Sequence, residues 1–144
     1  MIKNERQYRI TKAQAQKFHA ALRQLQANAA ESVSLHPRLR QAEADALQSQ
    51  WASLQAEIDD YEALLNGQQK SFSLSSFDEL PVALIKARIA SGLSQRELAG
   101  RLGLKEQQIQ RYEATEYASA SLSRVSAVIQ ALNVQVHEEV FLVT

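Results

Sequence analysis

The sequence has no cysteine, only four glycines and two prolines, and a single tryptophan. Without cysteine there are no disulfides and no thiolate metal sites. Aromatic residues make up only 6% of the 144 residues, so aliphatic side chains have to form most of the core. No apolar run approaches the ~20 residues of a membrane span, and the first residues lack the apolar stretch of a signal peptide. These absences predict a cytoplasmic protein without contact with a membrane.

Features of an enzyme are also missing from the sequence. The three histidines, His19, His36 and His137, are scattered and have no partner at the spacing of metal ligands. Asp59 and Asp60 are neighbours in a predicted helix, so their side chains point apart. No serine lies in a Gly-x-Ser-x-Gly elbow, and the few glycines form no phosphate-binding loop. We therefore expect no catalytic residues, no metal and no cofactor.

The net charge is zero, but the charges are unevenly distributed. Residues 1–23 hold six bases against one acid, residues 31–79 hold three against nine, and residues 80–132 hold seven against four. Ordinary solvated faces give such a pattern. A basic segment 1–23 and an acidic segment 31–79 that bind different partners would give the same pattern equally well.

Two helices are predicted in the N-terminal part of the chain. Thr11 and Gln14 have the spacing of a capping box, which predicts a helix over about 11–30. Pro37 suits the first turn of a second helix over 37–65. The second helix has apolar residues at alternating steps of three and four, the heptad pattern of coiled coils. This apolar seam consists of Ala44, Leu47, Trp51, Leu54, Ile58, Tyr61 and Leu65.

The seam has to be covered, and the sequence leaves three ways open. The first helix could fold back on the seam as an antiparallel hairpin. Alternatively, the seam could pair with another copy of the chain or with a partner protein. Trp51 and Tyr61 are typical of binding hot spots, but their places in the heptad favour a coiled-coil core. We thus predict a helical extension over 1–67, a linker over 68–77 and a second domain over 78–144.

The second domain contains two short predicted helices joined by a tight turn. Ser94 and Glu97 form a capping box that begins a helix over 95–102. Gly103 permits positive φ, and a second helix follows over 105–113. This arrangement is a helix-turn-helix, and a further helix is expected over about 121–132. The predicted core of the motif is Leu98, Ala99, Leu102, Gly103, Ile109 and Tyr112.

The outer face of the second short helix carries side chains suited to a DNA groove. Glutamine can pair with adenine through two hydrogen bonds, and Arg or Lys with guanine. Glu106 either accepts from a cytosine amine or caps its helix. At the start of the first short helix, Gln95 and Arg96 are candidates for phosphate contacts. The base-facing candidates are Lys105, Glu106, Gln107, Gln108 and Arg111.

The stretch "LSQRELAGRLGLKEQQIQRYE", residues 93–113, resembles the repressor-like helix-turn-helix of the Cro/C1 type, the XRE family. The resemblance extends over 78–133. It implies binding to double-stranded DNA, and because one such domain buries too little surface for high specificity, we expect a homodimer on an inverted repeat. It also implies that Gln95 contacts phosphate, while Glu106, Gln107 and Arg111 face bases. One departure is the tail, in which Val134, Val136, Val140 and Leu142 alternate with other residues as in a short strand.

The combination of this domain with a helical extension also resembles HigA-type antitoxins, which are repressors encoded beside a toxin. That resemblance implies an autoregulatory repressor whose extension binds a toxin protein. The alternative is a stand-alone regulator whose extension serves only for dimerisation. In both cases the expected fold is all-α, with room for one short C-terminal strand. It has an N-terminal hairpin or coiled coil followed by the helix-turn-helix domain.

Overall fold

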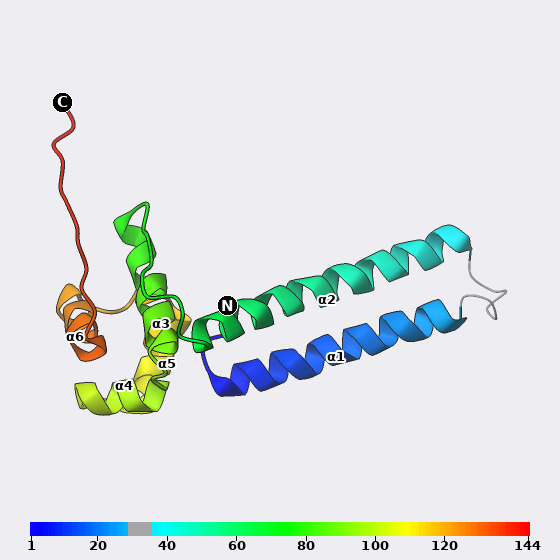
Figure 1. The fold of residues 1–144 in the computed structure, drawn as a ribbon, viewed down its shortest axis with the longest axis horizontal. Helices are drawn as coiled ribbons and strands as arrows, with labels where there is room; N and C mark the ends of the chain where they lie inside the picture. The colour runs from blue at the N-terminus through cyan, green and yellow to red at the C-terminus, as the bar shows by residue number, and fades with distance from the viewer. Residues whose placement is uncertain (29–35) are drawn as a thin grey trace. The chain divides into compact units, whose positions relative to one another are not determined.

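The computed structural model describes residues 1–28 and 36–144, which contain helices and no strand. The chain divides into two compact units, Met1–Ala63 and Leu64–Thr144 (Figure 1). The all-helical class expected from the sequence is confirmed. The helices are α1 (Glu5–Ala27), α2 (Pro37–Leu65), the 3₁₀ turn η2 (Phe77–Glu79), α3 (Leu80–Ala90), α4 (Gln95–Leu102), α5 (Glu106–Ala114) and α6 (Leu122–Leu132).

Helix α1 begins earlier than the capping pattern predicted. Its N-cap is Asn4, whose Oδ1 accepts from the Gln7 N–H at 2.8 Å. The Gln7 Oε1 accepts in turn from the Lys3 N–H at 2.8 Å. This reciprocal cap satisfies N–H groups at the start of the helix, so Thr11 lies inside α1 and the predicted start at 11 is wrong. The predicted end near residue 30 lies outside the described residues.

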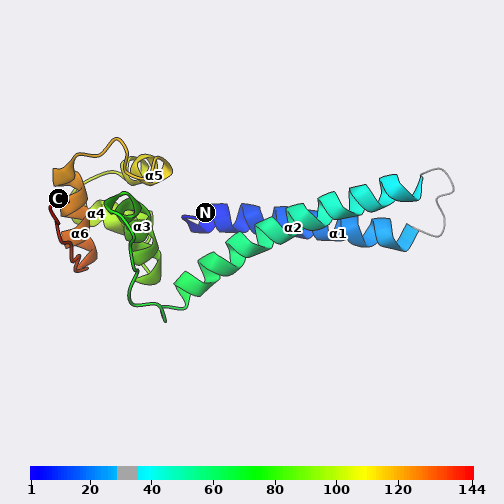
Figure 2. The same ribbon diagram turned by 90° about the horizontal axis from the view of Figure 1, so that it is seen from above.

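Helices α1 and α2 fold back on each other as an antiparallel hairpin, and both run side by side in Figures 1 and 2. The rings of Tyr8 and Tyr61 lie 5.2 Å apart, and His19 stacks on Trp51 at 5.0 Å. The two contacts are eleven residues apart on α1 and ten residues apart on α2, and they follow in opposite chain directions. The helices therefore run antiparallel. Of the three ways to cover the seam, the hairpin is therefore present within the chain.

Polar contacts add to the hairpin where α1 begins and α2 ends. The Tyr8 hydroxyl donates to the Glu62 carboxylate, and the Lys12 ammonium lies 3.8 Å from the same carboxylate. Lys12 also donates to the Tyr8 oxygen at 3.0 Å, and this contact raises the pKa of Lys12. All three side chains are solvent-accessible, so these contacts position the helices more than they stabilise them.

The second unit is built around aliphatic residues from four helices. Helix α4 packs against α5 and α6, and α3 packs against α6. The Arg101 Nη1 donates to the Ala131 carbonyl at 2.8 Å, which joins α4 to the end of α6. The buried residues of this unit include Leu80, Leu84, Ile85, Ile89, Leu98, Ala99, Ile109, Tyr117, Val128 and Leu132.

After Asn133, which ends α6 with φ 54°, the tail has no regular structure. The strand expected from the alternation of Val134 and Val136 does not form. The backbone groups of a lone strand find no neighbouring strand to pair with, and the described part of the chain offers none. The last apolar residues, Val140 to Val143, are exposed.

The turn between α4 and α5 depends on the backbone of Gly103. Its φ is 68°, in the left-handed region, and its N–H bonds to the carbonyls of Ala99 and Gly100. The next residue, Leu104, donates its N–H to the Ala99 carbonyl at 2.9 Å. A Cβ added at Gly103 would meet no atom within 4 Å. The requirement for glycine is therefore conformational and not steric.

We expect Gly103→Ala to lower the free energy of unfolding by about 1 kcal/mol, because alanine is strained at positive φ. Gly100→Ala is the matched control, since Gly100 lies within α4 and its added Cβ also meets open space. That variant should be more stable by about 0.5–1 kcal/mol. Urea denaturation followed by far-UV circular dichroism measures both. Equal stability of the two variants would contradict the left-handed turn.

Candidate nucleic-acid interface

Helix α5 has one buried side and one exposed side. Ile109 and Glu113, four residues apart, are fully buried. Apart from the half-buried Tyr112, the other residues of the helix and its N-cap are exposed to solvent. The five predicted base-facing residues all lie in this exposed region, together with Gln110, which the sequence reasoning had not included. The exposed set is Lys105, Glu106, Gln107, Gln108, Gln110 and Arg111.

Within this exposed set, Gln107 and Arg111 form a neighbouring pair of side chains that are free to bind a ligand. Gln108 is engaged at the start of the helix, where its Oε1 accepts from the Lys105 N–H at 2.9 Å. The side chains of Gln107 and Arg111 make no hydrogen bond or ion pair within residues 1–28 and 36–144. Because they are four residues apart, they lie on the same helix face. Together they present an amide beside a guanidinium.

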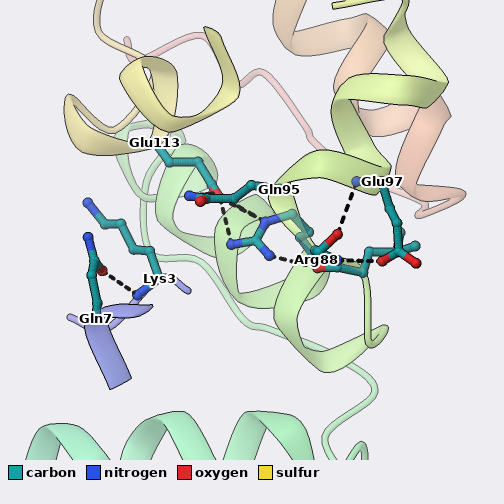
Figure 3. A network of polar contacts seen from close by, with 8 residues as sticks. Lys3, Gln7, Arg88, Gln95, Glu97 and Glu113 are labelled. Atoms are coloured by element: carbon teal, nitrogen blue, oxygen red, sulfur yellow. Dashed lines mark hydrogen bonds and ion pairs between the residues drawn. The ribbon is translucent and has the colours of Figure 1, made fainter. Parts of the chain in front are cut away.

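A buried ion pair holds α5 from behind. The Arg88 Nε and Nη2 atoms of α3 each lie 2.7 Å from the Glu113 Oε1 of α5 (Figure 3). The Arg88 Nη1 donates to the Leu93 carbonyl, also at 2.7 Å. Both side chains are almost completely buried. Since a buried charge is very unfavourable without a partner, the pair fixes α3, the loop after it and α5 in one arrangement.

Gln95, the first residue of α4, belongs to the same cluster. It is buried, and its amide nitrogen lies 3.4 and 3.5 Å from the two Glu113 oxygens. Figure 3 shows it beside the Arg88 guanidinium. The next residue, Arg96, is exposed and makes no side-chain contact in the described part of the chain. The role of both residues in phosphate binding stays a prediction, and only Arg96 has a freely accessible side chain.

The start of α4 is held by the capping box that the sequence predicted. The Ser94 Oγ accepts from the Glu97 N–H at 3.0 Å, and the Glu97 carboxylate accepts from the Ser94 N–H at 2.7 Å. The bonds from the Ser94 backbone and hydroxyl hold the pKa of Glu97 below its usual value. The first turn of α4 is thereby fixed beside the buried ion pair.

The end of α5 is fixed by an unusual turn. Glu116 and Tyr117 both have positive φ, 51° and 58°. The Tyr117 N–H donates to the Tyr112 carbonyl at 2.7 Å, and the two rings stack at 5.8 Å. Burial, and then the charge of Glu113, raises the pKa of the Tyr117 phenol, which stays protonated at neutral pH. Helix α5 is thus constrained at both ends and along its inner side.

The ion pair was not anticipated from the sequence, although a signal for each residue existed. Arg88 follows Leu84 and Ile85 at spacings of four and three, so it shares their buried face. Glu113 follows Ile109 at a spacing of four. Two opposite charges on the inward faces of neighbouring helices predict a buried ion pair.

Residues 84–138 match a family model described as helix-turn-helix. The C-terminal unit contains a helix-turn-helix domain. The match supports the resemblance to the XRE type and a role as a DNA-binding transcriptional regulator. It begins within α3 and ends in the tail, so α1, α2 and residues 66–83 lie outside it. Comparison with curated proteins and with solved structures gives no match.

In residues 1–28 and 36–144, no three side chains of His, Asp or Glu gather as they would around a metal ion. None of the helices in these ranges combines the length and the apolar composition that crossing a membrane requires.

We expect Glu113→Ala to destabilise the helix-turn-helix domain by about 3–5 kcal/mol, because it leaves the Arg88 guanidinium buried without its partner. The double variant Arg88→Met/Glu113→Leu should cost much less than the sum of the single variants Arg88→Met and Glu113→Leu, since it removes both charges together. Glu138→Ala, in the exposed tail, is the control and should stay within about 0.5 kcal/mol of wild type. Denaturation of these variants and the wild type would contradict this role if the effects of Arg88→Met and Glu113→Leu were additive.

Proposed function

We propose that the protein is a sequence-specific transcriptional repressor that reads duplex DNA with α5. The observation that carries this proposal is the two-sided character of the helix. Its inner side is locked by Ile109 and the Arg88–Glu113 pair, while its outer side offers Gln107 and Arg111 to solvent. A rigid helix with free amide and guanidinium groups is what base recognition in the major groove requires.

The chemistry of the outer side suggests how the helix distributes its contacts. Gln107 can bond the N6 and N7 of adenine, and Arg111 the O6 and N7 of guanine. Lys105, at the N-cap of α5, can likewise bond a guanine. Glu106 lies at the N-terminus of the helix, where a carboxylate is favoured by the helix dipole, and it can accept from the amine of cytosine. Arg96 of α4 contacts the backbone.

A single domain of this size contacts too little DNA for high specificity, so two copies should bind together. We infer a homodimer on an inverted repeat, with half-sites about 34 Å apart or at a multiple of that distance. A site in the promoter of the protein's own gene would make the repressor autoregulatory.

A second candidate function concerns the extension and follows from the incomplete burial of the α2 seam. Leu47, Trp51 and Leu54 are only half-buried in the hairpin, and α2 carries six acids against two bases. A basic partner protein would fit such a surface, as in an antitoxin that both represses its operon and holds a toxin. Co-purification with the product of the neighbouring gene tests this function, and a protein that purifies alone when the two genes are co-expressed would argue against it.

We expect Gln107→Ala and Arg111→Ala each to weaken binding to the cognate operator by about 1–3 kcal/mol, with little effect on unrelated DNA. Arg96→Ala should weaken binding to all sequences alike, because phosphates carry no sequence information. Gln95→Ala should do the same, although loss of its contact with Glu113 can also lower stability. Titration of operator and scrambled duplexes checks these roles. Full discrimination by Gln107→Ala would show that α5 reads DNA through another face.

We also expect a symmetric footprint on the operator. Protection by hydroxyl radicals should appear in two equal halves whose centres lie one helical turn apart, or a multiple of it, because each α5 enters one major groove. DNA containing only one half-site should bind much more weakly. Protection of a single half, on the gene's own promoter and on selected sites alike, would exclude the dimeric repressor.

A further inference from the structure

The hairpin of α1 and α2 buries only some of its apolar residues completely. Ala15 and Leu22 of α1 are buried, as are Ile58 and Tyr61 near the end of α2. The middle of the hairpin is different, because its large apolar side chains stay half-exposed. These are Phe18, Leu25, Leu47, Trp51 and Leu54. Each helix of a two-helix hairpin has one neighbour, whereas the core of a four-helix bundle gives it two. The hairpin therefore lacks a second layer.

The two helices carry opposite charges. Helix α1 has five bases and one acid, a net charge of +4. Helix α2 has six acids and two bases, a net charge of −4, and both bases lie within its first four residues. The bases of α1 are Arg6, Arg9, Lys12, Lys17 and Arg23, and the acids of α2 are Glu43, Asp45, Glu57, Asp59, Asp60 and Glu62.

Contacts within the chain use only part of this charge. Lys12 pairs with Glu62, and Arg9 lies 3.9 Å from Glu5 of its own helix. In contrast, a set of exposed side chains makes no hydrogen bond or ion pair within residues 1–28 and 36–144. These are Arg6, Lys17 and Arg23 on α1 and Glu43 and Asp60 on α2. The hairpin thus carries unpaired bases on α1 and unpaired acids on α2 within the described residues.

We propose that the hairpin docks on the hairpin of a second copy to form a four-helix bundle, with α1 of each copy against α2 of the other. A surface with one basic and one acidic helix is complementary to itself under a two-fold rotation. The half-exposed apolar residues then meet in the middle, and the charges pair at the edges. A purely basic or purely acidic partner would satisfy only one of the two helices.

The charges also select the symmetry axis. Two hairpins can stack face to face about an axis perpendicular to their helices, which places α1 on α1 and α2 on α2. Like charges then face each other, and this is unfavourable. About an axis parallel to the helices, each α1 faces the α2 of the other copy. Both hairpin tips then lie at one end of the bundle, and both chains leave α2 at the other end.

This arrangement deepens the proposed function and rests on it in one respect, namely that two domains bind one operator. Because both chains leave the bundle at the same end, the two domains following Leu65 start close together. The opposite symmetry would separate them by the length of the bundle. The association itself needs no DNA, so it is measured on the full-length protein alone. Its failure is therefore distinguishable from a failure of DNA binding.

Charge reversal tests the pairing. One chain carries Arg6→Glu, Lys17→Glu and Arg23→Glu, and the other carries Glu43→Lys and Asp60→Lys. Sedimentation should show a dimer for the wild type, a dissociation constant raised at least tenfold for each variant alone, and a restored heterodimer on mixing. Lys70→Glu, an exposed change outside the helices, is the control for Lys17→Glu and should leave the dimer intact. Circular dichroism monitors the helix content of each chain.

Two results would overturn the pairing. The first is a full-length wild-type protein that stays monomeric at tens of micromolar, including one that forms a stable complex only with a different basic protein. The second is a mixture of the two reversed chains that associates no better than each chain alone, whether or not their helices stay folded. The first result would mean that the hairpin binds a different protein or none. The second would mean that charge does not determine how two hairpins associate.

A distance measurement tests the symmetry in the unaltered charge background. The chain has no cysteine, so Ala27→Cys, at the exposed end of α1, accepts a single spin label. With the parallel axis, the two labels of a dimer should lie within about 25 Å, since neighbouring helix axes are 8–10 Å apart. With the perpendicular axis, they should be separated by roughly the length of α1, about 35 Å or more. The longer distance would rule out the proposed bundle.

Discussion

A buried charge has to keep its partner, and the helix-turn-helix domain is organised around one such pair. Arg88 and Glu113 lie 25 residues apart and connect α3 to α5, while Arg88 also binds the carbonyl of Leu93 before α4. An aliphatic core alone tolerates small shifts between helices, because dispersion contacts have little direction. The ion pair does not tolerate them. It converts a loosely specified cluster of short helices into a rigid support for the outer face of α5.

The parts of the fold that could be predicted are those with strong local signals. The capping box of Ser94, the positive φ of Gly103 and the proline that begins α2 depend on residues close in sequence. The start of α1 was predicted at the wrong residue because Thr11 and Asn4 are both suitable N-cap residues. Residue type alone does not decide which of them begins the helix. The ion pair was missed because the choice of partner depends on how α3 and α5 pack. That choice is a tertiary property.

In the candidate site, too, the features set by local sequence could be predicted, and those set by tertiary packing could not. The exposure of Gln107 and Arg111 follows from their spacing relative to Ile109, so the periodicity of α5 was enough to anticipate it. The burial of Gln95 was not evident, because its partner Glu113 lies in another helix. The tail illustrates the opposite error. Its alternation of valines is a local strand signal, but a strand is completed by a neighbour, and the described residues provide none.

The single tryptophan has a practical consequence. Trp51 lies in the hairpin, where it stacks on His19, whereas the helix-turn-helix domain contains only tyrosine and phenylalanine among its aromatic residues. Tyrosine pairs occur in both units, Tyr8 with Tyr61 and Tyr112 with Tyr117, so tyrosine signals do not separate the two. Indole emission reports on the extension alone, so the melting of the hairpin can be followed without attaching a dye.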